Sequence, residues 1–193
     1  MMSEAFFKGM VEKWGDVKAI VEMAKQLDLE KLKSWIKVCI ENASGYEKHR
    51  FAFLLQEFVN IIGTRLGFIV SSGEWQKEGP DGLWERDDKK IVVETKASSF
   101  YLNFEKIMDY IKSRKALGAI AVSSEFSKDK IAAVKGEYAG KIRLVTIEGL
   151  TKLAELREKA VISLDSVFFV GISSIFATRY GSVDIKSTNF ILA

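Results

Sequence analysis

Residues 80–96 read PDGLWERDDKKIVVETK, and this stretch predicts two β-strands joined by a charged turn. Pro80, the one proline of the chain, stands directly before Asp81, so a sharp turn delivers an acidic residue to the start of the first strand. Four charged residues at 87–90 separate that strand from the apolar residues 91–93, which favour a second strand. We therefore expect a β-hairpin with its turn near residues 87–89.

Glu94 and Lys96 end the second strand, and strand alternation places both on one face. Twelve residues separate Asp81 from Glu94, and an antiparallel hairpin lets the two carboxylates lie close together. Such a pair beside a lysine suits one divalent cation. The alternative is that Asp81 caps a turn and that Glu94 and Lys96 form a surface ion pair without function. The joint pattern of turn, hairpin and charged strand end favours the functional interpretation.

Apolar periodicity extends the pattern on both sides of the hairpin. It predicts, in order, a helix at 51–66, a strand at 68–70, the hairpin, a helix at 103–117, a strand at 119–122, a helix at 128–138, a strand at 142–147 and a helix through about 160. The order is that of an α/β fold with a mixed β-sheet flanked by helices.

Three regions follow from these patterns. Residues 1–46 are expected to form an N-terminal helical appendage or subdomain, with Asp16 and Asp28 as helix N-caps. Residues 47–160 form the core. Residues 161–193 are too apolar to lie free in water, so they either complete the core or form a dimer interface.

Composition limits the classes of function. With 193 residues, 48% of them hydrophobic and 28% charged, the chain is an ordinary globular protein with one dominant core. No stretch is long and apolar enough for a membrane helix and no secretory signal is visible, so a cytoplasmic protein is expected. Cys39 and His49 are the only residues of their types, which excludes a Cys/His metal cage and leaves oxygen ligands for any metal. The net charge of +3 comes without a basic tail, so a folded groove would have to bind any nucleic acid.

Pro80-Asp81 with Glu94-Thr95-Lys96 resembles the signature of the PD-(D/E)XK, or restriction-endonuclease-like, nuclease superfamily. The helix–hairpin–helix–strand order over residues 50–125 is similar to the core of that superfamily. The stretch from RLGFIV at residues 65–70 up to the Glu-x-Lys at 94–96 also resembles archaeal Holliday-junction resolvases, although the elements after residue 125 and the N-terminal helices exceed a minimal resolvase. The resemblance therefore implies a restriction-endonuclease-like mixed sheet flanked by helices.

The resemblance also implies roles for individual residues. Asp81, Glu94 and the Thr95 carbonyl would hold Mg2+, for which Mn2+ could substitute, and the metal would acidify a bound water. Lys96 would orient or help to deprotonate that water and stabilise the charged phosphate oxygens. Members often carry a further acid on the helix before the first strand, and Glu57 matches that position, with Glu47 as a weaker rival.

Candidate DNA contacts are predicted from residue type and from position in the sequence relative to the motif. Ser98 and Ser99 follow the motif, where hydroxyls could meet phosphate, and Lys106 and Lys112 lie on the polar face of the next helix. Most lysines on such a face are simply solvated. Trp75, in a polar loop, is the candidate for stacking on a base.

The function expected from the sequence is that of a Mg2+-dependent DNA endonuclease resembling restriction enzymes. A homodimer is favoured, because two-fold symmetry places two active sites on opposite strands of a duplex. A structure-selective, Holliday-junction-type resolvase, a nuclease-fold module that binds nucleic acid without cutting, and a purely structural scaffold stay open as alternatives.

Overall fold

Five strands form one mixed sheet in the computed structural model, which describes residues 3–14, 16–43, 48–73 and 78–158. The strands are β1 (Ile69–Ser72), β2 (Gly82–Arg86), β3 (Lys89–Lys96), β4 (Gly118–Ser123) and β5 (Ile142–Thr146). The helices are α1 (Glu4–Trp14), α2 (Val17–Lys25), α3 (Leu29–Asn42), α4 (Lys48–Arg65), the 3-10 helix η1 (Ser99–Tyr101), α5 (Phe104–Arg114), α6 (Lys128–Lys135) and α7 (Ile147–Glu158).

The strands lie in the order of the chain, β1 to β5. The first three are antiparallel, whereas β4 and β5 are parallel to their neighbours because α5 and α6 provide the crossovers. Asp87 and Asp88 both have positive φ, 50° and 62°, which is the backbone of a tight hairpin turn that follows the strand twist. The predicted hairpin, and with it the α/β class with a mixed sheet flanked by helices, is confirmed.

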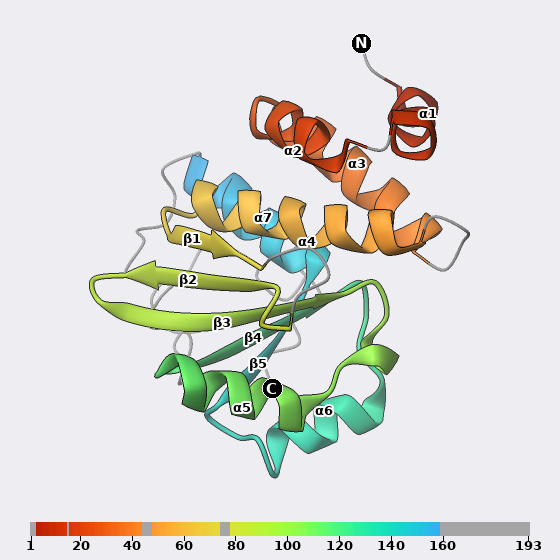
Figure 1. Cartoon of the computed structure of the whole chain (residues 1–193). Helices are drawn as coiled ribbons and strands as arrows, with labels where there is room; N and C mark the ends of the chain where they lie inside the picture. Colours follow the sequence, from red (N-terminus) through yellow and green to blue (C-terminus); the bar gives the residue numbers. More distant parts are fainter. Residues whose placement is uncertain (1–2, 15, 44–47, 74–77, 159–193) are drawn as a thin grey trace.

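Strand β3 lies between two hydrophobic cores, one on each face of the sheet. Ile91 and Val93 pack with α4 and α7 on one face, while Val92 packs with α5 and with residues of β4 and β5 on the other. Successive side chains of a strand point to opposite faces, so a strand that is buried on both faces reads as a continuous apolar run. Figure 1 shows the resulting layers, with α4 and α7 on one side of the sheet and α5 and α6 on the other.

The N-terminal helices lie over α4, on the side away from the sheet (Figure 1). Asp16 accepts a hydrogen bond from the Ala19 amide at 3.1 Å, and Asp28 accepts one from the Lys31 amide at 2.8 Å, so both predicted N-caps are confirmed. The ring of Trp35 stacks on Phe7 and tilts against Phe58 of α4, with centroid distances of 4.3 and 5.9 Å. Helices α1 to α3 belong to one hydrophobic cluster that continues through α4 to the sheet residues Trp84 and Ile91.

Two helices end earlier than their apolar pattern predicts. Helix α5 ends at Arg114 rather than at 117, because Lys115 adopts the left-handed conformation that closes many helices, with φ of 52°. Helix α6 ends at Lys135 rather than at 138, and Gly136 follows as its C-cap. Local backbone geometry, which apolar spacing does not reveal, set both ends.

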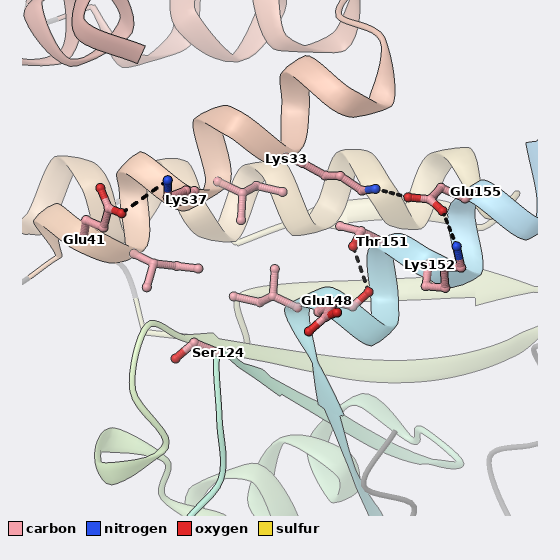
Figure 2. A pocket seen from close by; sticks show the side chains of 11 residues that line it. Lys33, Lys37, Glu41, Ser124, Glu148, Thr151, Lys152 and Glu155 are labelled. Carbon is pink, nitrogen blue, oxygen red and sulfur yellow. Dashed lines mark hydrogen bonds and ion pairs between the residues drawn. The ribbon is translucent and has the colours of Figure 1, made fainter. Parts of the chain in front are cut away.

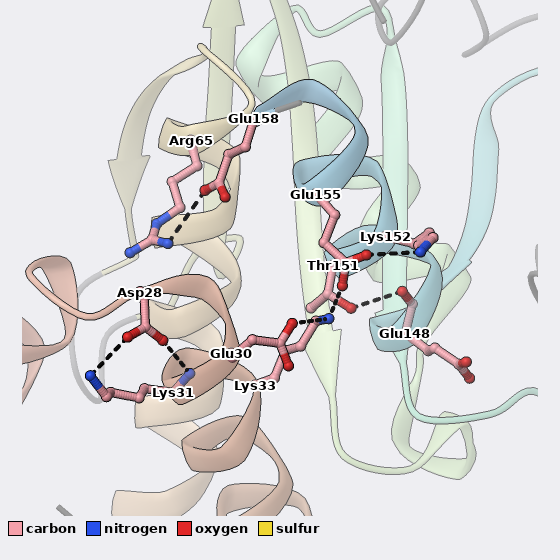
Figure 3. Close-up of polar contacts among 10 residues, drawn as sticks. All are labelled: Asp28, Glu30, Lys31, Lys33, Arg65, Glu148, Thr151, Lys152, Glu155 and Glu158. Carbon is pink, nitrogen blue, oxygen red and sulfur yellow. Dashed lines mark hydrogen bonds and ion pairs between the residues drawn. The ribbon is translucent and has the colours of Figure 1, made fainter. Parts of the chain in front are cut away.

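A polar network ties the ends of α4 and α7 to the α2–α3 connection, and Figure 3 shows its Arg65–Glu158 pair. Arg65 donates to the carbonyl oxygen of Leu27 and lies 3.6 Å from Glu158, while Arg157 donates to the carbonyl oxygen of Arg65 at 2.5 Å. These contacts satisfy polar groups at the C-terminal end of α4 and hold the two helices together.

Within the described part of the chain, no helix has both the length and the apolar character needed to cross a membrane. The predicted role of residues 161–193, in the core or at a dimer interface, falls on residues outside the described ranges.

Candidate functional site

Asp81, Glu94 and Lys96 meet where the β2–β3 hairpin opens. The Nζ atom of Lys96 lies 2.9 Å from Oδ2 of Asp81 and 2.7 Å from Oε1 of Glu94. The side chains of Asp81 and Glu94 are each 12% exposed and that of Lys96 is 26% exposed, so this is a sheltered cluster rather than a surface ion pair. The amide of Thr95 donates to Oδ2 of Asp81 at 2.7 Å, which fixes the carboxylate against the end of β3.

The backbone around Asp81 is held by α4. Asn60 donates from Nδ2 to the carbonyl oxygen of Asp81 at 2.9 Å, and the amide of Gly73 donates to the same oxygen at 3.0 Å. Gln56 donates from Nε2 to Oδ1 of Asp81 at 2.6 Å. A Cβ atom at Gly82 would lie 2.3 Å from Oδ1 of Asn60, so glycine is required there for helix and strand to approach this closely.

Glu57 projects from α4 and is 9% exposed. Its Oε2 accepts a hydrogen bond from the hydroxyl of Ser72 at 3.1 Å, whereas its Oε1 is buried without a hydrogen-bond partner among the described residues. Burial raises the pKa of Glu57, and the negative charge of Asp81 raises it further. Glu57 therefore lies within the electrostatic field of the cluster.

Burial and charge also shift the pKa values within the cluster. Burial and the neighbouring Asp81 raise the pKa of Glu94, although Lys96 acts in the opposite direction. Burial by itself would lower the pKa of Lys96, but the carboxylates of Asp81 and Glu94 outweigh it and raise the pKa. Lys96 is therefore held as an ammonium ion, which suits it to stabilise negative charge rather than to accept a proton.

The residues at the hairpin end provide oxygen donors for a hard cation. Within the described residues, no three His, Cys, Asp or Glu side chains are arranged as a ready ligand set. Oε2 of Glu94 and Oε1 of Glu57 are nevertheless buried without hydrogen-bond partners in that part of the chain. Buried polar atoms normally have partners, and carboxylate oxygens are the ligands that Mg2+ prefers. The carboxylate oxygens of Glu94 and Glu57 are therefore of the donor type that fits such an ion. By contrast, both oxygens of Asp81 already accept hydrogen bonds, from Gln56, Thr95 and Lys96.

The predicted nucleic-acid contacts divide into two groups. Lys106 is exposed in the first turns of α5, 3.7 Å from Glu78, and its charge lowers the pKa of Glu94, so it lies near the cluster. Lys112 is exposed further along α5. Ser98 caps η1, and Ser99 is only 4% exposed, with its hydroxyl accepting a hydrogen bond from the Ser127 amide at 3.3 Å. The Ser99 hydroxyl is thus engaged in the fold. Trp75 lies outside the described residues.

Sequence reasoning missed the polar residues that support the cluster. Gln56 and Asn60 lie one turn apart on α4, and Asn60 bridges to Ser72 and to the indole of Trp84, with Trp84 Nε1 donating to Oδ1 of Asn60 at 2.9 Å. Asn60 is 3% exposed. An asparagine in the middle of an apolar helix was the available signal, because a buried amide requires partners.

A cavity of about 800 Å3 lies between α3, α7 and the end of β4 (Figure 2). Its lysines face glutamates: Lys37 lies near Glu41, and Lys33 and Lys152 both contact Glu155. The cavity reaches the loop after the motif, because Ser124 at its edge donates to the carbonyl oxygen of Ala97 at 2.7 Å. Its lining residues are Lys33, Ile36, Lys37, Ile40, Glu41, Ser124, Ile147, Glu148, Thr151, Lys152 and Glu155.

Comparison of the chain with models of protein families and with curated proteins found no match.

Proposed function

We propose that this protein is a Mg2+-dependent endodeoxyribonuclease with a restriction-endonuclease-like core. One observation carries the proposal. The β2–β3 hairpin brings together Asp81, Glu94 and Lys96, and they form a single sheltered cluster of two carboxylates and an ammonium ion. A structural scaffold has no need to bury two carboxylates beside each other, because burial of charge is unfavourable unless it is compensated.

The arrangement of elements supports the same proposal. Helix α4, the strands β1 to β3, helix α5 and the parallel strand β4 follow one another in the order that the resemblance to PD-(D/E)XK nucleases implies. The charged cluster lies where β2 begins and β3 ends, next to the carboxyl end of β4 through the pairing of Lys96 with Ser123. Ligand sites commonly lie at the carboxyl ends of parallel strands.

Each residue of the cluster has a role in the proposed hydrolysis. Asp81 and Glu94, with the Thr95 carbonyl, would hold Mg2+, which supplies an acidified water and neutralises charge on the scissile phosphate. Lys96, kept protonated by the two carboxylates, stabilises the negative charge that develops on the phosphate oxygens and orients the attacking water. Glu57, whose buried Oε1 has no hydrogen-bond partner among the described residues, would be a further acidic ligand once an ion draws the carboxylates together. Gln56 holds Asp81 in place.

The proposal is tested by cleavage of supercoiled plasmid and of a synthetic four-way junction, each with Mg2+ or Mn2+. The wild-type protein is compared with Lys96→Ala and with a matched control, Lys135→Ala, which removes an exposed lysine at the end of α6. We expect the wild type and the control to cut and Lys96→Ala to lose cleavage while it keeps most of its DNA binding. Loss of cleavage in both variants, or in neither, would contradict the assigned role of Lys96.

The choice of substrate distinguishes the proposal from its alternatives. Cutting of plasmid supports a restriction-like enzyme, whereas cutting confined to the junction supports a structure-selective resolvase. Binding of both DNAs without cutting, under every metal condition, would support a non-cleaving nucleic-acid-binding module. Homodimer formation, which the two-fold arrangement of cuts in a duplex favours, is checked by light scattering of the same samples.

A further inference from the structure

Two adjacent aromatic side chains are exposed directly after the motif. Phe100 is 80% exposed and Tyr101 is 70% exposed, both in η1, four and five residues beyond Lys96. Their ring centroids lie 5.3 Å apart at an interplanar angle of 89°, so the rings contact edge to face. Large aromatic side chains are usually buried, and neighbouring exposed rings mark an interaction surface.

The backbone beneath these rings is anchored on both sides. Ser99, which is buried, accepts a hydrogen bond from the Ser127 amide, and Lys130 donates from Nζ to the carbonyl oxygen of Leu102 at 2.5 Å. Leu102 is 2% exposed. The short helix is thus fixed by the residues on each side of the aromatic pair, which presents the rings outward on a supported platform.

The platform lies close to the proposed catalytic cluster. Phe100 lies four positions after Lys96 in the chain, so their Cα atoms are at most about 14 Å apart even if the segment is fully extended. Successive nucleotides of a strand rise by about 3.4 Å. A DNA strand whose phosphate lies at the cluster therefore has bases within reach of the rings only a few nucleotides away.

The charges next to the platform indicate which form of DNA it would recognise. The first turns of α5 and α6 and the loop before α6 carry no excess of cations: their three lysines, Lys106, Lys128 and Lys130, are matched by three acids, Glu105, Glu125 and Asp129. Binding to an intact duplex depends mainly on phosphate contacts by an excess of cations. Aromatic rings instead bind unstacked bases, whose faces are accessible only where the duplex is open or single-stranded.

We propose that Phe100 and Tyr101 stack on unpaired bases beside the scissile phosphate, so that the substrate class is DNA with an opened or single-stranded region. This inference rests on the proposed nuclease function and specifies its substrate. The aromatic pair determines where the strand is held, and the cluster of Asp81, Glu94 and Lys96 acts on the phosphate.

Binding measurements test the inference separately from cleavage. Fluorescence anisotropy, with calcium in place of magnesium, compares a labelled single strand, a duplex with a central bubble and the fully paired duplex. The Phe100→Ala/Tyr101→Ala variant is expected to bind the single strand and the bubble at least about tenfold more weakly, because stacking on each ring is lost. Its affinity for the paired duplex should change by less than about twofold, since phosphate contacts dominate there.

Two further variants keep the test specific. Phe6→Ala removes another exposed aromatic side chain, 49% exposed on α1, and should bind all three DNAs like the wild type. Phe100→Trp/Tyr101→Phe retains aromatic faces and should restore binding to the opened DNAs. Thermal unfolding checks that each variant is folded. If the double variant does not fold, the single variant Phe100→Ala provides the test.

The outcomes separate this inference from the proposed function. Unchanged binding of opened DNA by the folded double variant, or an equal loss on the paired duplex, overturns the inference even if the wild type cuts DNA. Loss confined to opened DNA supports stacking of Phe100 and Tyr101 on unpaired bases, and absence of cleavage by the wild type would then count against the proposed nuclease function alone. Unchanged DNA binding together with altered self-association in sedimentation would identify the pair as an interface between copies of the chain, and it would overturn the inference.

Discussion

Replacement of Lys96 by methionine would leave the buried carboxylates of Asp81 and Glu94 without their shared counter-charge. Methionine keeps the unbranched shape of the lysine stem, so the substitution removes charge with little change in volume. The variant tests whether the cluster is electrostatically coupled, and it does so without reference to catalysis. We expect Lys96→Met to be less stable than the wild type at neutral pH.

The expected loss is about 3 kcal/mol in the free energy of unfolding, the lower end of the range for removing one partner of a buried ion pair. The lower end applies because Lys96 keeps 26% of its side chain exposed, so water compensates part of the lost charge. The two carboxylates are each 12% exposed and cannot be hydrated to the same degree.

The loss should also depend on pH. The pKa of Glu94 in the folded protein is raised by burial and by Asp81, and removal of Lys96 takes away the main influence that lowers it. Between the ordinary glutamate pKa of about 4.3 and the raised value, the folded state binds more protons than the unfolded state. Stability therefore falls as the pH rises through that window, and the window is wider in Lys96→Met. Acidification towards the ordinary pKa should reduce the difference from the wild type.

Urea denaturation at a series of pH values measures both effects. Lys31→Met is the matched control, because Lys31 lies 2.8 Å from Asp28 but both side chains are about half exposed, and such pairs contribute little. A Lys96→Met protein as stable as the wild type at neutral pH would refute the coupling, and so would a difference that does not change with pH.

Three other substitutions and one ligand titration test separate features. Gly63→Ala should destabilise the protein by about 1–3 kcal/mol in urea denaturation despite its better helix propensity, because the added Cβ would lie 2.4 Å from the buried ring of Trp84; a gain would contradict the packing. Glu57→Gln should be more stable than the wild type at neutral pH and lose that advantage on acidification, since burial raises the pKa of Glu57 and its charge opposes folding only above its ordinary pKa; a constant difference across pH would contradict this. Lys115→Gly should raise the free energy of unfolding by about 1 kcal/mol, because Lys115 is left-handed with φ of 52°; an unchanged midpoint in thermal unfolding would contradict it. Added calcium should raise the unfolding temperature of the wild type but not that of Asp81→Asn, and equal shifts in both would argue against a cation at the cluster.

Much of the fold could be predicted because its signals are local. The apolar run 91–93 marks a strand buried on both faces, and the acidic residues 16 and 28 are N-caps whose partners lie three residues away. The hairpin turn was recognisable from its charged residues, although the left-handed backbone of Asp87 and Asp88 was not. The ends of α5 and α6 were misjudged because they depend on the conformation of one or two residues.

The approach of Asp81 to Glu94 was also predictable, since it requires only the hairpin. The support of the cluster by α4 was not, because Gln56 and Asn60 reach Asp81 across 25 and 21 residues of chain. No periodic pattern shows that a helix packs against the start of one particular strand. The burial that raises the pKa of Glu57 and Glu94 has the same origin.

The sequence by itself determined which elements form, the charge of each strand end and the presence of two acids and a lysine on one hairpin. The tertiary structure decided how deeply those charges are buried and which amides hold them. It also decided that Phe100 and Tyr101 are exposed while Ser99 and Leu102, on either side of the pair, are buried. The physical reason is that hydrogen bonding and apolar spacing act between near neighbours in the chain, whereas burial depends on which distant surfaces come together.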